Sequence, residues 1–293
     1  MVDNRRALHQ PKRVGNHRAR INVRSSLSYF VLLVVALALL LPFWWMLLSA
    51  LEPTQILTKT GIAALIPQSV TLIHFIDAFQ EVPLWLYMKN TLFIAGFVML
   101  GNLVSNTLVA YSLAKIPWKG RNVAFLIILA TMMLPYQVTM IPLYILFHNL
   151  HWINTYLPLI VPAFFGNAFF IFLLRQFMMG IPAELSESAR IDGASEIRVF
   201  YSVILPELIG PITAMLIFVF MGTWGDFVAP LLYLNNPNKW TISLGLYRFV
   251  SIHGMQWGRL MAASVVFALP IMILFAVGQG RLIKGLNFTG LKG

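Results

Sequence analysis

Few residues in this 293-residue chain have types and spacing suited to catalysis. The absence of cysteine excludes disulfides, thiolate metal sites and a cysteine nucleophile. No glycine-rich phosphate loop is followed by Lys and Ser or Thr, so the chain cannot itself be an ATPase. Of the six histidines, only His148 and His151 approach metal-ligand spacing, and a pair in a turn is more typical of a solvated loop. We therefore expect no catalytic residue, no cofactor and no metal site.

One acidic residue is placed where it could bind a polar cargo. Asp226 falls deep in an apolar segment or near its outer end, where a carboxylate is costly unless it faces water or a partner. Aromatic faces stack on sugar rings and carboxylates accept hydrogen bonds from hydroxyl groups, so Trp224, Asp226 and Phe227 are candidates to line a translocation pathway. The alternatives are an interfacial anchor for Trp224 and a helix-to-helix acceptor for Asp226. Gln137, which follows Pro135 closely, marks either a gate or a kink.

The polar loop 180–208 predicts a helix, a sharp turn and a second helix. Pro182 suits a first helical position, and Glu184 falls in the first turn, where exposed backbone amides favour negative charge. Gly193 ends this helix, because glycine adopts the left-handed conformation at the lowest cost. Ser195 can then cap the second helix. The small residues 188 and 189 are expected at the closest approach of the two helices.

The amino-acid composition indicates whether the helices that carry these residues face water or lipid. The chain is 59% hydrophobic and 11% charged, against about 25% charged in soluble proteins. It is therefore predicted to be an all-α, polytopic membrane protein. The charge of +11 does not indicate nucleic-acid binding, because the basic residues flank the apolar runs instead of forming a patch.

Apolar runs long enough to cross the hydrocarbon predict six membrane spans. The run 122–174 is too long for one crossing, and the polar turn around His148–Asn154 divides it into two. The predicted spans are 27–49, 90–114, 123–147, 156–178, 209–233 and 260–281.

The distribution of Lys and Arg predicts that both termini are cytoplasmic. The amino-terminal arm, residues 1–26, is rich in Arg and Lys. It is expected to be disordered and to be held at the membrane by anionic lipid. Basic residues also follow the second and fourth spans, whereas the turn after the third span has none. A signal peptide is the alternative for the first apolar run, which is longer than such a segment requires. The outer segment 51–88 is expected to form short interfacial helices that either dock a binding protein or simply pack.

The loop pattern resembles the coupling loop of permease subunits from binding-protein-dependent ABC importers. The resemblance is carried by Glu187, Ser188, Ala189 and Gly193, and by the segment Val203–Pro206, with Ser188 where the family usually has a second alanine. It implies that 187–193 is a coupling helix that seats on an ATPase subunit, with Glu187 as its charged anchor. The ATPase-coupling residues implied are Glu184, Glu187, Ser188, Ala189, Arg190, Asp192, Gly193, Leu205 and Pro206.

Three further segments resemble the carbohydrate-uptake branch, specifically its maltose-permease-like second subunit. They are Ile171–Gln176, Gly222–Pro230 and Leu260–Ser264, and the closing Leu291–Gly293 resembles the tail of that subunit. Gly225 replaces the usual asparagine before Asp226.

The resemblance implies a six-helix permease domain, residues 27–293, of the type I ABC importer kind. Its implied partners are a second homologous permease, two ATPase subunits that bind ATP and Mg²⁺, an extracytoplasmic solute-binding protein and a carbohydrate, with a di- or oligosaccharide favoured. The implied location is the cytoplasmic membrane of a bacterium or archaeon. The alternatives are a secondary transporter, which would need intramembrane carboxylates or an inverted repeat, and a redox membrane anchor, which would need histidines within its spans.

Overall fold

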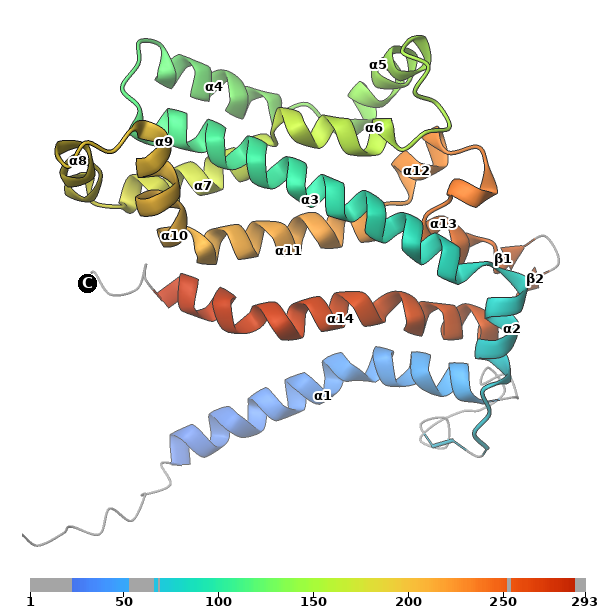
Figure 1. Cartoon of the computed structure of the whole chain (residues 1–293). Helices are drawn as coiled ribbons and strands as arrows, with labels where there is room; N and C mark the ends of the chain where they lie inside the picture. The colour runs from blue at the N-terminus through green and yellow to red at the C-terminus, as the bar shows by residue number, and fades with distance from the viewer. Residues whose placement is uncertain (1–22, 53–65, 68, 252–253, 288–293) are drawn as a thin grey trace, which may run out of the picture. The chain divides into compact units, whose positions relative to one another are not determined.

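The computed structural model describes residues 23–52, 66–67, 69–251 and 254–287, and these are almost entirely helical (Figure 1). The chain divides into two units, residues 1–45 and 46–293, which are described separately. The first unit holds most of α1 (Val23–Leu51), whose apolar side chains from Leu27 to Leu41 are exposed, as expected of a lipid-facing helix. The predicted basic arm 1–26 lies outside the described residues up to residue 22, and its last four residues are helical.

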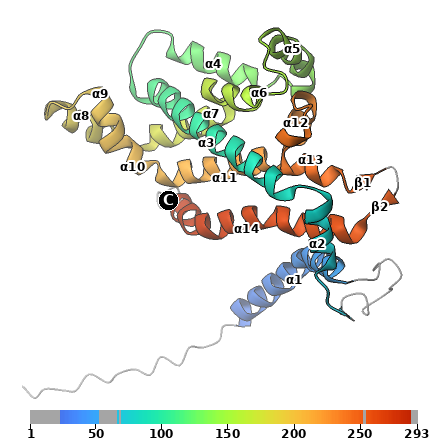
Figure 2. The ribbon, with the colours of Figure 1, turned by 45° about the vertical axis from the view of Figure 1, so that its right-hand side comes forward.

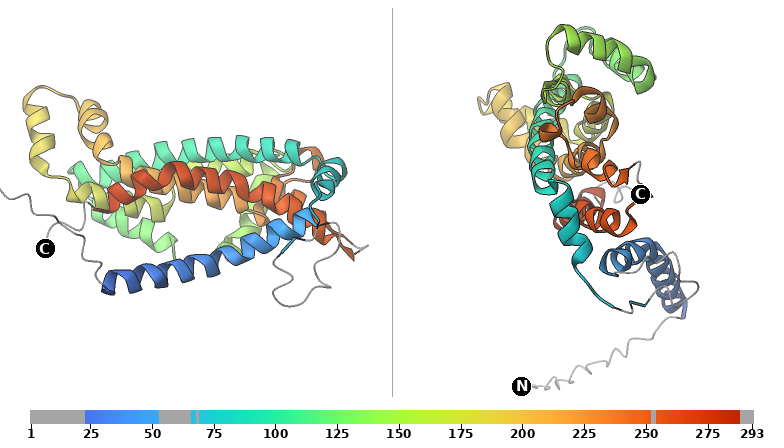
Figure 3. Two further views of the ribbon diagram at one scale, coloured as in Figure 1. Left: turned by 90° about the horizontal axis from the view of Figure 1, so that it is seen from below. Right: turned by 90° about the vertical axis from the view of Figure 1, so that its right-hand side faces the viewer.

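The second unit is built around α3 (Leu84–Lys115), which packs against α7 (Ala168–Gly180) and α11 (Ile209–Gly225). Helix α14 (Trp257–Asn287) packs on α11, so these helices run side by side (Figure 3). Among the described residues, four helices are long and apolar enough to cross a membrane, or up to six if each of two bent pairs is one span. The predicted number of six spans agrees with the second count.

The predicted third span is broken and is not a single helix. Helices α4 (Arg121–Thr131) and α5 (Tyr136–Asn149) meet at an angle of 96°. Pro135 precedes α5 in an extended conformation (φ −67°, ψ 144°), and a proline also disfavours helical geometry at the residue before it. The bend between α4 and α5 therefore has a local cause in the sequence.

The predicted fourth span also contains a break. It consists of α6 (Leu157–Ile160), the 3₁₀ turn η3 (Val161–Phe165) and α7, separated by Gly166 at φ +90°. A polar contact with α3 compensates for this break: the Asn106 Oδ1 atom accepts a hydrogen bond from the Asn167 backbone N–H at 2.7 Å. The Asn167 side chain in turn caps α7 by accepting from two backbone amides of its first turn.

The predicted fifth span, 209–233, ends early. Helix α11 stops at Gly225, Asp226 is extended, and the short α12 (Val228–Tyr233) follows. Beyond α12 lie the 3₁₀ turn η5 (Pro237–Lys239), α13 (Ile242–Tyr247) and a two-residue antiparallel pair. This pair is β1 (Val250–Ser251) with β2 (Gly254–Met255), in which Val250 is opposite Met255.

Hydrogen bonds join the start of α3 to this late segment. The Asn90 Nδ2 group donates to the backbone carbonyls of Asn238 (2.9 Å) and Trp240 (3.0 Å). The Ile242 backbone N–H donates to the buried Thr91 hydroxyl at 2.9 Å, across 151 residues of sequence. The start of α3 is thus completed by residues that come much later in the sequence.

Part of the predicted outer segment is seen as α2 (Ile73–Glu81), whereas residues 53–65 and 68 lie outside the described residues. Arg259 of α14 forms ion pairs with Asp77 (3.1 Å) and Glu81 (2.7 Å) of α2. This segment therefore contains one of the predicted short helices, fixed to α14 by charge. The closing tail Leu291–Gly293 also lies outside the described residues.

Candidate functional site

Two features lie at opposite ends of α11: a helical loop that precedes it and a cavity at its far end. The loop contains α8 (Ala183–Ile191), α9 (Glu196–Val199), the π-helical turn η4 (Phe200–Ile204) and α10 (Leu205–Glu207). Figure 2 shows α8 and α9 at the end of the unit where α11 begins. A bend of 78° separates the second half of the loop from α11.

The turn between α8 and α9 has the geometry that the sequence predicts. Gly193 adopts φ +83°, and its N–H donates to the Arg190 carbonyl at 3.0 Å. The Ala194 N–H donates to the Ala189 carbonyl at 3.0 Å, which completes a Schellman cap. Ser195 caps α9 by accepting from the Arg198 N–H, as predicted, whereas Pro182 is the residue before α8 and not its first helical residue.

The pair Leu205 and Pro206 explains why the turn before it is π-helical. Pro206 lacks an N–H, and its ring would clash with the carbonyl four residues earlier in a regular α-helix. The chain instead widens, and the Leu205 N–H donates to the Phe200 carbonyl, five residues back. Pro206 therefore shapes the second half of the loop, with Leu205 half-buried against the core.

The outward face of the loop combines charged groups with exposed apolar side chains. The structure leaves Glu184, Glu187, Ser188 and Asp192 exposed. It also exposes four large side chains of the loop: Leu185 (45%), Ile191 (86%), Ile197 (72%) and Tyr201 (61%). Exposed apolar groups rimmed by charge are typical of a protein-docking surface.

The inward face of the loop differs from the prediction at one position. Ala189 is half-buried against the core, as expected of a small residue at a close approach, but Ser188 is exposed. Ser186 is the buried serine of α8, with 2% of its surface accessible.

Two residues outside the predicted set connect the loop to α3. The Arg190 Nε atom lies 2.6 Å from Glu196 Oε1, and the Tyr111 hydroxyl donates to Glu196 Oε2 at 2.8 Å. The hydrogen bond to Glu196 raises the pKa of the Arg190 guanidinium above its ordinary value, so this side chain stays charged. The sequence signal that could have identified Glu196 is the opposite charge of Arg190 and Glu196 on either side of the Gly193 turn.

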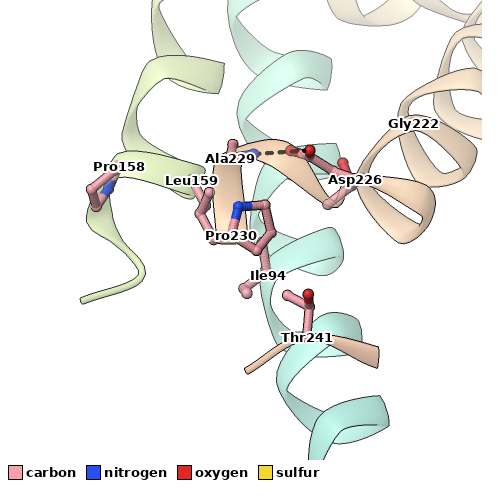
Figure 4. A pocket seen from close by; sticks show the side chains of 9 residues that line it. Ile94, Pro158, Leu159, Gly222, Asp226, Ala229, Pro230 and Thr241 are labelled. Carbon is pink, nitrogen blue, oxygen red and sulfur yellow. Dashed lines mark hydrogen bonds between the residues drawn. The ribbon is translucent and has the colours of Figure 1, made fainter. Parts of the chain in front are cut away.

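The second feature is a cavity of about 230 Å³ at the far end of α11 (Figure 4). Its lining comes from α3, α6, α11, α12 and the residue before α13. The lining residues are Ile94, Pro158, Leu159, Gly222, Thr223, Asp226, Ala229, Pro230 and Thr241.

Asp226 is the charged residue among the described side chains that line this cavity. Its Oδ1 atom accepts a hydrogen bond from the Ala229 backbone N–H at 3.2 Å, so this oxygen also caps the first turn of α12. The Asp226 backbone carbonyl accepts from the Ser243 hydroxyl. The carboxylate therefore combines a local structural role with a position at the cavity wall.

The other predicted pathway residues do not line this cavity. Trp224 is fully buried, donates its Nε1–H to the Phe267 carbonyl at 2.9 Å and stacks on Phe220, so it is a packing residue here. Phe227 contacts the Tyr247 ring at 5.5 Å, and Gln137 is exposed in the first turn of α5. Of the four candidates the structure brings only Asp226 to the cavity.

This combination of bundle, loop and cavity defines a polytopic, helical membrane transport subunit. Residues 106–287 match the family described as binding-protein-dependent transport system inner membrane component, and the chain belongs to this family. The prediction of an ABC-importer permease is thereby confirmed.

The named relatives are similar over nearly their whole length. The chain is 34% identical over 262 residues to the arabinooligosaccharides transport system permease protein AraQ of Halalkalibacterium halodurans, covering 88% of this chain and 93% of AraQ. It is 30% identical to the diacetylchitobiose uptake system permease protein DasC of Streptomyces coelicolor, covering 89% and 94%.

Solved structures share the fold. A bacterial ABC transporter involved in the import of the acidic polysaccharide alginate matches with a TM-score of 0.77 at 20% identity, covering 88% of this chain and 96% of that chain. A second structure, of a bacterial alginate transporter in complex with a pentasaccharide-bound periplasmic protein, matches with a TM-score of 0.58 at 19% identity, covering 87% and 93%.

Proposed function

We propose that this chain is one permease half of an importer that carries an oligosaccharide across the cytoplasmic membrane of a bacterium or archaeon. The named relatives, which transport arabinooligosaccharides and diacetylchitobiose, support a carbohydrate cargo. The structural neighbour that holds a periplasmic protein supports delivery by an extracytoplasmic binding protein. The second permease half would be a homologous chain, and ATP and Mg²⁺ would be held by two separate ATPase subunits.

The observation that carries the proposed coupling is the exposed face of α8 and α9. Among the described residues, Ile191 and Ile197 are two of the most exposed apolar side chains, and Ile191 lies outside every candidate span. An ATPase subunit with an apolar groove and a basic rim would cover Ile191 and pair with Glu187. Together with the distribution of basic residues, this supports a cytoplasmic location for the loop and both termini.

The absence of native cysteine allows a direct test by cross-linking. Ile191→Cys in the assembled transporter should form a cross-link to a cysteine-bearing ATPase subunit, and the yield should change with nucleotide. His151→Cys, in an exposed turn predicted to lie outside the membrane, is the matched control and should not cross-link. The proposal fails if the two positions react equally, or if Ile191→Cys reacts with a membrane-impermeant reagent added from outside intact cells.

The cavity supports a neutral cargo over an acidic one. Asp226 is the charged residue among the described side chains that line it, and a like charge 4 to 6 Å away costs about 3 to 4 kcal/mol at an effective dielectric constant near 20. The hydroxyls of Thr223 and Thr241 can exchange hydrogen bonds with a neutral sugar.

The variant Asp226→Asn tests this charge selection, because asparagine keeps an oxygen to accept from Ala229 but removes the charge. We expect binding of trigalacturonate to the detergent-purified transporter, measured without binding protein, to tighten by about two to three orders of magnitude. Binding of neutral arabinotriose should change much less. Equal changes for the two probes would refute charge selection without affecting the evidence for coupling.

A further inference from the structure

The contact of Glu196 with Tyr111 joins the loop to the helix that reaches the cavity. The Glu196 carboxylate receives Arg190 of α8 on one oxygen at 2.6 Å and the Tyr111 hydroxyl of α3 on the other at 2.8 Å. The Arg190 Nη2 group also contacts the second oxygen, at 3.3 Å. One carboxylate thus connects α8, α9 and α3.

The Tyr111 side chain is rigidly held. It is 5% exposed, and its ring lies 5.0 Å from the ring of Phe200, the residue that starts the π-helical turn. Hydrogen bonds to a charged acceptor are stronger than neutral ones, so the buried tyrosine and the ionised glutamate form a firm contact. A second hydrogen bond between α3 and the loop lies one turn further along α3, where the Lys115 Nζ group donates to the Ile181 carbonyl at 2.7 Å.

The same α3 helix reaches the cavity at its other end. Ile94 lines the cavity, and α3 continues without a break from Ile94 to Tyr111. At about 1.5 Å per residue this distance is about 26 Å. A displacement of α8 that moves Tyr111 along the helix axis therefore also moves Ile94.

We propose that Tyr111 and Glu196 are positioning residues that transmit movement of the α8–α9 loop through α3 to the cargo cavity. This inference rests on the proposed function, because it requires α8 to be moved by an ATPase. The bridge keeps the loop and α3 moving together, while Ile191 and Glu187 remain free to contact the partner. Without the bridge, the loop moves partly independently of α3, so less of its nucleotide-driven movement reaches the cavity.

The variant Tyr111→Phe removes the hydroxyl and leaves the buried ring and the Arg190–Glu196 pair in place. Tyr29→Phe is the matched control, since Tyr29 lies in α1, outside the loop and the cavity, and is 72% exposed. The complete transporter, reconstituted with its binding protein in vesicles of phosphatidylethanolamine and phosphatidylglycerol, is assayed for ATP hydrolysed per arabinotriose imported. We expect Tyr111→Phe to raise this ratio about threefold to tenfold with ATP turnover retained, and Tyr29→Phe to leave it unchanged.

A second variant and a cross-link separate the possible failures. Glu196→Gln, which removes the charge from the same bridge, should also raise the ratio. An unchanged ratio in Tyr111→Phe and Glu196→Gln overturns the inference, as does loss of assembly in both, which would make the bridge merely structural. The cross-link from Ile191→Cys to the ATPase, measured in the Tyr111→Phe background, should persist. If that cross-link is missing even with Tyr111 present, the proposed function itself has failed.

Discussion

Replacing Gly193 by alanine tests whether the turn between α8 and α9 depends on its left-handed backbone. Gly193 has φ +83°, and a Cβ added there would meet no other atom within 4 Å. The cost is therefore backbone strain alone, about 1 to 2 kcal/mol for an L-residue in this conformation. Since 1.4 kcal/mol is about tenfold in an equilibrium constant, the turn should open about tenfold more often.

Hydrogen exchange of the purified transporter measures this opening directly. The amides of Gly193 and Ala194 donate to the carbonyls of Arg190 and Ala189 at 3.0 Å, so both are protected only while the turn is closed. We expect exchange of the peptide containing them to accelerate about tenfold in Gly193→Ala. Gly193→Asn should be affected less, because asparagine tolerates the left-handed region.

Gly180 provides the matched control for this measurement. It ends α7, has an ordinary φ, and a Cβ there would also meet nothing within 4 Å. Alanine at position 180 should leave exchange in the turn unchanged and should stabilise α7 by up to about 1 kcal/mol. Equal acceleration of exchange in the two alanine variants, or none in Gly193→Ala, would show that the left-handed backbone at residue 193 does not control the opening of the turn.

Three further predictions concern the bundle and the loop. Gly101→Ala would place a Cβ 2.8 Å from the Phe164 ring and 3.1 Å from a backbone carbon, so thermal unfolding in detergent should show a loss of about 1 to 3 kcal/mol. Trp224→Phe removes the bond to the Phe267 carbonyl and should lower stability by about 1 to 3 kcal/mol while leaving cargo affinity unchanged; a selective loss of affinity would return Trp224 to the pathway. Glu187 is exposed, so Glu187→Ala should insert normally but reduce transport-coupled ATP hydrolysis, and unchanged uptake would contradict its role as an anchor.

Local signals in the sequence were sufficient for the loop. Gly193 and Ser195 are capping residues whose effect depends on their immediate neighbours, and the structure confirms both. The long apolar runs likewise predict six spans, and the described residues contain four candidates, or up to six if each bent pair is one span.

Features that depend on distant residues could not be predicted in this way. The break at Gly166 lies inside a continuous apolar run, where hydropathy gives no sign of an interruption, whereas α11 ends where the charged Asp226 interrupts such a run. The break at Gly166 depends on the contact of Asn167 with Asn106, 61 residues away. The bridge from Tyr111 to Glu196 spans 85 residues, so the local sequence gives no sign that Tyr111 is a partner of Glu196.

The hydrogen bonds between the start of α3 and the segment near Trp240 bear on how the protein is made. The Thr91 hydroxyl accepts a hydrogen bond from the Ile242 backbone N–H, and Ile242 is synthesised 151 residues later. During synthesis, the start of α3 therefore stays incomplete until residues 238–242 have been made. A chain released before residue 238 would lack both carbonyl partners of Asn90, so its α3 would begin with a side-chain amide that has lost these two acceptors.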